Sequence, residues 1–149
     1  MKLSLREVAP LTLVLALTLV GTGWIFGTLR PLKPETLSGL PWLLGWGFLQ
    51  QYALQAFVLT RLRGTLGRPV TAAAIAAAIF ALHHLPNPLL TLVTLLAGFV
   101  WCSLFQRRPN LFTLTVSHLA LSLALSHSLS PKWTGGLRVG PGYFDFCEK

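Results

Sequence analysis

The chain has few charged residues and very few acidic ones. Only 11% of its 149 residues are Asp, Glu, Lys or Arg, whereas 53% are hydrophobic. Soluble domains carry about 25% charged residues, so the composition excludes an ordinary soluble protein and indicates an integral membrane protein. The four Asp and Glu residues all lie outside the long apolar stretches. Those stretches therefore contain no carboxylate.

Cysteine is equally scarce, and the positive charge does not form a nucleic-acid site. Cys102 and Cys147 have no CxxC spacing, which argues against a disulfide framework or a thiolate metal site. The formal net charge is +8, but the cations border apolar stretches and do not form a basic stripe with interleaved aromatics. We therefore expect membrane lipid as a partner, and no nucleic acid.

Four intervals lack any charged residue, and each is long enough for a membrane span of about 20 residues: 8–29, 36–60, 69–106 and 109–131. The third interval is long enough for two shorter helices, and the prolines of His84-Leu85-Pro86-Asn87-Pro88 supply the break. The sequence predicts an all-α, multi-pass membrane helical bundle of about five transmembrane helices. Their predicted ranges are 8–28, 40–62, 71–85, 89–105 and 111–129.

We divide the chain into an amino-terminal anchor helix and loop, 1–39, and a helical core with a polar tail, 40–149. The first helix is read as an anchor because Gly21-Thr22-Gly23 is a poor signal-peptide cleavage site and further spans follow. The third helix is short and its turn is uncharged, so the third and fourth helices are predicted to form a sunken hairpin with a vestibule above it. The tail, 130–149, either caps this vestibule or forms an interfacial loop.

The distribution of cations predicts the orientation. Seven of the 12 Lys and Arg residues lie in the amino terminus and in the loops at 61–68 and 107–108; Arg30, Lys33, Lys132, Arg138 and Lys149 lie on the opposite side. By the positive-inside rule, the amino terminus faces the cytoplasm and the carboxyl terminus is extracytoplasmic, in a cell (inner) membrane.

The second predicted helix carries three amides, Gln50, Gln51 and Gln55, where lipid contact would favour Leu. An unpaired amide in hydrocarbon costs about 4–8 kcal/mol on the strictest scale, so these side chains should face protein, water or a ligand. Gln51 and Gln55 share a helix face, and Gln50 lies about 100° away from Gln51. They form either a polar site or hydrogen bonds between helices.

Histidines supply the other candidate groups. His83 and His84 end the third helix, and Phe80 lies four residues before His84. The fifth helix carries a polar row at helical spacing: Thr115, His118, Ser122 and Ser126. We predict that His84 and His118 share a cavity opposite the glutamine face, and that His127 contacts the membrane interface.

This set of residues is a poor zinc site. A catalytic zinc normally has three ligands drawn from His, Asp, Glu or Cys, together with water. His84 and His118 provide two, whereas glutamine is a weak ligand that cannot accept a proton. Ser122 shares a face with His118, but no third group is evident to orient a base for nucleophilic catalysis.

Three motifs in order resemble the CPBP family of intramembrane metalloproteases, the CAAX proteases and bacteriocin-processing (Abi) proteins. Where the family shows EExxxR, FxxxH and HxxxN, this chain has QQYALQ (50–55), FALHH (80–84) and HLALS (118–122). The stretches HLPNP (84–88), PNLFTLTVSHLA (109–120) and RVGPGYF (138–144) are also similar to the family. The resemblance implies that Gln50, Gln51, His84 and His118 occupy the catalytic positions, with His84 and His118 as metal ligands.

The departures from the family pattern affect chemistry more than fold. Both family glutamates are replaced by Gln50 and Gln51, the arginine by Gln55, and the final asparagine by Ser122. The resemblance implies that the first glutamate would activate water, so Phe80, His84 and His118 match while the base does not. Gln55, Phe80, His83 and Ser122 remain candidate binding residues.

Three hypotheses follow, and whether the chain is an enzyme stays open among them. The first is a degenerate pseudoprotease with a polar intramembrane cavity, without a certain cofactor. The second is an active metalloendopeptidase, in which zinc is the cofactor and Gln50 or Gln51 positions a water. The third is a non-enzymatic accessory subunit that binds lipid, a prenyl chain or pigment. The expected partners are membrane lipid and a membrane protein or a prenylated or peptide ligand.

Overall fold

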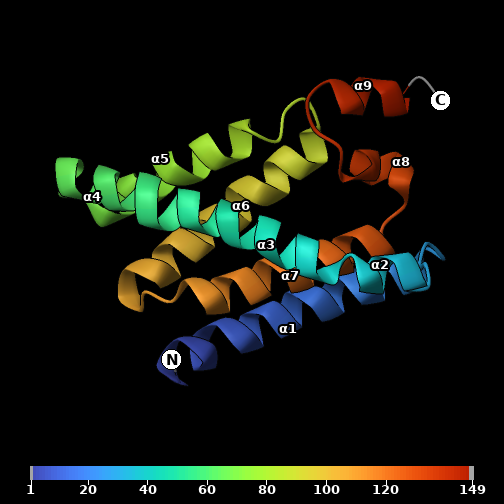
Figure 1. The fold of residues 1–149 in the computed structure, drawn as a ribbon, viewed down its shortest axis with the longest axis horizontal. Helices are drawn as coiled ribbons and strands as arrows, with labels where there is room; N and C mark the ends of the chain where they lie inside the picture. Colours follow the sequence, from blue (N-terminus) through green and yellow to red (C-terminus); the bar gives the residue numbers. More distant parts are fainter. Residues whose placement is uncertain (1, 148–149) are drawn as a thin grey trace.

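A computed structural model of the chain describes residues 2–147, which are mainly helical and contain no β-strand (Figure 1). The predicted all-α class is confirmed. Four of the five predicted helices correspond to α1 (Lys2–Ile25), α5 (Pro69–Leu82), α6 (Pro88–Arg107) and α7 (Leu111–Ser128). The other is one continuous segment, composed of α3 (Leu40–Gln51), η1 (Tyr52–Leu59) and α4 (Thr60–Leu66). Shorter helices complete the fold: α2 (Pro34–Ser38), α8 (Pro131–Thr134), η2 (Gly135–Leu137) and α9 (Pro141–Cys147).

Proline, asparagine and glycine set the helix boundaries. Helices α5 and α6 both start at a proline, whose missing N–H would have no helical partner at that position. Asn87 caps α6 by accepting from the Leu90 N–H at 3.0 Å, and Asn110 caps α7 by accepting from the Thr113 N–H at 3.1 Å. Gly67 ends α4 in the left-handed region, at φ 64°.

The second helix differs from the regular helix that the sequence predicts. Its middle, Tyr52–Leu59, is a π-helix, and the helical segment continues four residues beyond the expected end to Leu66. Both the N–H and the hydroxyl of Thr60 donate to the Gln55 carbonyl, the hydroxyl at 2.9 Å. This spacing of five residues, in place of the four of an α-helix, widens the helical turn that begins at Gln55. Wide turns of this kind are frequent at functional sites.

Three helices are long and apolar enough to cross a membrane: Leu5–Ile25, Pro88–Arg107 and Leu111–Ser128. Helix α5 is apolar but only 14 residues long, as expected for the short arm of the predicted hairpin. It ends at Leu82 and not at Leu85, because residues 83–86 form a turn. This turn contains the cis Leu85–Pro86 bond. The predicted helical membrane bundle is therefore confirmed.

Small residues allow the closest helix contacts. Ala72, Ala73, Ala76 and Ala77 on α5 are fully buried, and α5 packs along α6. A Cβ on Gly98 of α6 would lie 3.4 Å from the Ala77 Cα, so this contact requires a glycine or a displaced neighbour. Helices α1 and α3 both pack against α7.

The cationic segments of the amino terminus and of the loops after α4 and α6 lie at one end of the molecule (Figure 1). Arg108 forms an ion pair with Glu7 at 3.1 Å, and the Gln106 amide donates to the Pro69 carbonyl at 3.1 Å. Helices α2, α8 and α9 lie at the opposite end. Lys149 lies outside the described residues, and so does the side chain of Lys2. Which end faces the cytoplasm stays a prediction.

Asn87 fixes the carboxyl-terminal tail to the α5–α6 turn. Its buried amide donates to the carbonyls of Thr134 and Arg138, at 2.7 and 3.1 Å, while the Gly140 N–H donates to the Leu85 carbonyl at 2.9 Å. Gly135, at φ 57°, permits this approach, since a Cβ there would lie 2.7 Å from the Asn87 amide nitrogen. Residues 130–147 of the tail are therefore an ordered part of the fold.

Candidate functional site

A chain of buried amides connects α3 to α7. Gln51 and Gln55 are fully buried, and the Gln55 amide donates to the Gln51 side-chain oxygen at 3.2 Å. The Gln51 amide in turn donates to Nδ1 of His118 at 3.4 Å. The predicted common face of Gln51 and Gln55 is confirmed by this bond. Gln50 is only half-buried, on a different side of the helix.

Aromatic rings enclose His118. Trp101 of α6 lies against it, with ring centroids 4.9 Å apart and planes tilted by 35°, and Phe80 of α5 meets it edge-on at 6.2 Å. The Trp101 indole N–H donates at 3.2 Å to the hydroxyl of Ser117, which also bonds to Thr12 of α1 at 2.7 Å. Three helices, α3, α5 and α6, therefore contact this imidazole of α7 directly, and α1 bonds to the adjacent Ser117.

Phe80 also connects the two candidate histidines. Its ring lies 4.8 Å from that of His84, and the His84 Nδ1–H donates to the Phe80 carbonyl at 2.8 Å. Both histidines therefore contact the same aromatic ring. The adjacent His83 is exposed and bonds back to the Ile79 carbonyl at 2.7 Å.

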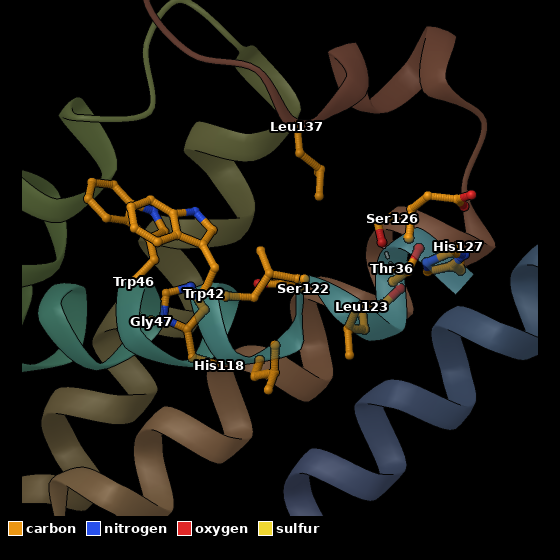
Figure 2. A pocket seen from close by; sticks show the side chains of 14 residues that line it. Thr36, Trp42, Trp46, Gly47, His118, Ser122, Leu123, Ser126, His127 and Leu137 are labelled. Carbon is orange, nitrogen blue, oxygen red and sulfur yellow. Dashed lines mark hydrogen bonds between the residues drawn. The ribbon is translucent and has the colours of Figure 1, made fainter. Parts of the chain in front are cut away.

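A pocket of about 470 Å³ lies between α3 and α7, with His118 and Ser122 along one wall (Figure 2). Apolar side chains such as Trp42, Trp46 and Leu123 line it. Ser126 continues the predicted polar row of α7 along the pocket, whereas Thr115 is buried in the protein interior. The candidate binding residue Ser122 is thus beside an accessible volume.

The donor set does not fit zinc. No group of three His, Cys, Asp or Glu residues within the described part of the chain could hold a metal ion. Nδ1 of His118 already accepts from Gln51, so the neutral ring carries its proton on Nε2 and offers no lone pair there. His84, with Nδ1–H on a carbonyl, keeps its Nε2 as an acceptor. One available imidazole lone pair falls short of the three ligands a catalytic zinc needs.

Sequence reasoning missed several groups around this site. Trp101 lies against His118, although its sequence context indicates only a membrane span. Glu35 and Leu137 line the pocket from segments read as a loop and a tail. Thr36, next to Glu35, lies beside Ser126 and His127 in Figure 2, far along the pocket from His118. In the sequence, only the aromatic ring of Trp101 and the carboxylate of Glu35 mark any of these residues as candidates.

Fold and site together define a helical membrane protein in which buried amides join α3 to His118 beside an apolar pocket. His84 contacts Phe80, and the lining of that pocket includes His118 but not His84. The family model for Type II CAAX prenyl endopeptidase Rce1-like proteins matches residues 31–124, which include the glutamine helix, both histidines and most of α7. The chain belongs to this Rce1-like family. No curated protein and no solved structure matches the chain.

Proposed function

We propose that this chain is a non-catalytic member of the Rce1-like family, a pseudoprotease whose pocket binds a ligand instead of cleaving one. The observation that carries this proposal is the hydrogen bond from the Gln51 amide to Nδ1 of His118. At the position where the resembling proteases have a glutamate, a neutral amide accepts no proton and draws no metal. The roles of Gln50, Gln51, His84 and His118 are part of this proposal.

The electrostatics of the site support the same conclusion. The mechanism that the family resemblance implies activates water with a carboxylate and a metal-bound hydroxide. The acidic residues in the described part of the chain are Glu7, Glu35 and Asp145, and Glu7 is paired with Arg108 at the far end. Glu35 lies on α2 and lines the pocket. Its neighbour Thr36 lies far along the pocket from His118.

The pocket supports the binding half of the proposal. Its volume of about 470 Å³ lies within the range of about 300–1,000 Å³ for small-molecule sites. Its walls are mainly apolar, with a few polar groups from one face of α7. We place the amino terminus on the cytoplasmic side, so this pocket would open toward the extracytoplasmic leaflet.

A cleavage assay tests the proposal. The full chain, purified in detergent with added zinc, is incubated with a farnesylated peptide ending in a CAAX sequence, the substrate type that the family name specifies. We expect no product above a no-protein control. Turnover by the wild-type chain that His118→Ala abolishes, and that Trp24→Ala on the exposed face of α1 retains, would overturn the proposal in favour of the active hypothesis.

A further inference from the structure

The apolar pocket continues into a second, basic one. The second pocket, of about 290 Å³, is lined by Arg30 and Lys33, and it shares four residues with the first: Thr36, Ser126, His127 and Leu137. Together they form one groove, which has an apolar arm along Trp42 and Leu123 and a polar arm toward the loop after α1. An apolar arm joined to a cationic one matches an amphiphile with an anionic head.

The position of tryptophan places this groove at the depth of lipid headgroups. Trp42 is 75% exposed and Trp46 is 51% exposed, both on the first turns of α3. Trp133 on α8 contacts Phe26 at the end of α1, with ring centroids 5.7 Å apart. Exposed tryptophans at helix ends mark the membrane interface. Headgroups therefore lie level with Arg30 and Lys33, and acyl chains lie level with the apolar arm.

The charge balance of the groove favours an anion. Arg30 and Lys33 outnumber Glu35, the acidic lining residue. Arg30 is held in place by its side chain and its backbone. Its guanidinium donates to the carbonyls of Ser126 and Leu129, and its backbone N–H donates to the His127 carbonyl at 2.8 Å. Nδ1 of His127 is buried without a hydrogen-bond partner among the described residues, at the point where the two arms meet.

We propose that the groove binds one anionic phospholipid from the surrounding leaflet, with an acyl chain between α3 and α7 and its phosphate at Arg30, Lys33 and His127. This inference deepens the proposed function, since it names the ligand class of the same pocket. The lipid enters sideways from the bilayer, past the exposed Trp42. Its headgroup connects the loop after α1 to the carboxyl-terminal end of α7.

Native mass spectrometry of the full chain in detergent tests the inference, with dioleoyl phosphatidylglycerol and dioleoyl phosphatidylcholine as probes. We expect one phosphatidylglycerol per chain, bound at least about fivefold more tightly than phosphatidylcholine, as one or two basic contacts allow. Lys33→Gln should reduce this preference about fivefold. Lys132→Gln, which removes a cation at the same end outside both pockets, should leave the preference unchanged.

A second pair of variants tests the apolar arm. Trp42→Ala should weaken binding of both lipids, whereas Trp24→Ala, which removes a 76% exposed tryptophan from α1, should not. Equal binding of the two lipids, equal effects of Lys33→Gln and Lys132→Gln, or equal effects of the two tryptophan variants would overturn the inference. A chain that cleaves the farnesylated peptide but binds phosphatidylglycerol in this way refutes the proposed function alone.

Discussion

The α5–α6 pair and the α3–α7 pair are built in opposite ways. Alanines and Gly98 bring α5 and α6 together without space between them, whereas α3 and α7 leave a pocket of about 470 Å³. In a membrane, apolar contact brings no hydrophobic gain over lipid, so close packing depends on small residues. Where α3 and α7 carry tryptophan, leucine and polar side chains instead, they make a site. The mutations that follow test this contrast from the largest expected effect to the smallest.

Asn87→Ala should be the most damaging change, because it removes the hydrogen bonds that hold the turn between α5 and α6 to the carboxyl-terminal tail. The variant loses the cap of α6, worth about 1 kcal/mol, and leaves the Thr134 and Arg138 carbonyls unpaired at about 1–3 kcal/mol each. We expect a loss of about 3 kcal/mol in the free energy of unfolding, measured by denaturant titration in detergent. The tail should also become sensitive to protease.

Asn110→Ala is the matched control, because it removes only the cap of α7 and should cost about 1 kcal/mol. Equal losses of stability for the two variants would contradict the role given to Asn87.

Gly98→Leu tests the close contact between α5 and α6. A Cβ at this position already approaches Phe80 and Ala77 at 3.3 and 3.4 Å. Overpacking of this kind typically costs about 1–3 kcal/mol. The matched variant is Gly45→Leu on α3, where a Cβ meets nothing within 4 Å. We expect thermal unfolding to separate the two variants clearly; a tolerated leucine at 98 would show that α5 and α6 do not need close approach.

Gln51→Leu removes the amide connection between α3 and α7. Hydrogen bonds between membrane helices average about 0.6 kcal/mol, and Gln51 makes one to His118 and one to Gln55. The expected loss in unfolding free energy is therefore about 1 kcal/mol. Gln50→Leu, at the half-buried neighbour, should change stability less. A loss above that of Gly98→Leu would mean that the amides, and not the small residues, hold the bundle together.

Leu123→Trp should affect stability least while affecting binding most. Leu123 is half-buried and lines the apolar arm of the groove, so a larger side chain has room there. We expect the unfolding free energy to stay within about 0.5 kcal/mol of wild type. Phosphatidylglycerol occupancy in native mass spectra should fall several-fold. Unchanged occupancy would show that this pocket is not the lipid site.

The sequence predicts much of the fold because charge and proline mark the spans so clearly. Charge-free intervals identify the long helices, and the Pro86–Pro88 break identifies the α5–α6 hairpin. The spacing of Gln51 and Gln55 predicts their shared face, which their hydrogen bond confirms. Each of these predictions depends on residues close together in the chain.

Features made by distant segments are not predictable in this way. The π-helix after Gln51 depends on Thr60 and on how the segment packs. The contact of Trp101 with His118 and the bonds from Asn87 to the tail join residues 16 or more positions apart, and no local pattern encodes them. The pocket between α3 and α7 also brings Glu35 of α2 and His127 to the same lining, although they lie far apart in the chain. Which candidate residues act on a ligand remains a prediction.

The metal content of the purified wild-type chain is the most direct test of the claim that the site is non-catalytic. Elemental mass spectrometry after zinc-supplemented purification should find far less than one zinc per chain, because Gln51 bonds to Nδ1 of His118 and no carboxylate among residues 2–147 completes a ligand set. His84→Ala and His118→Ala should leave that low content unchanged. About one zinc per chain, lost in both histidine variants, would contradict the claim and identify the site as a metal centre.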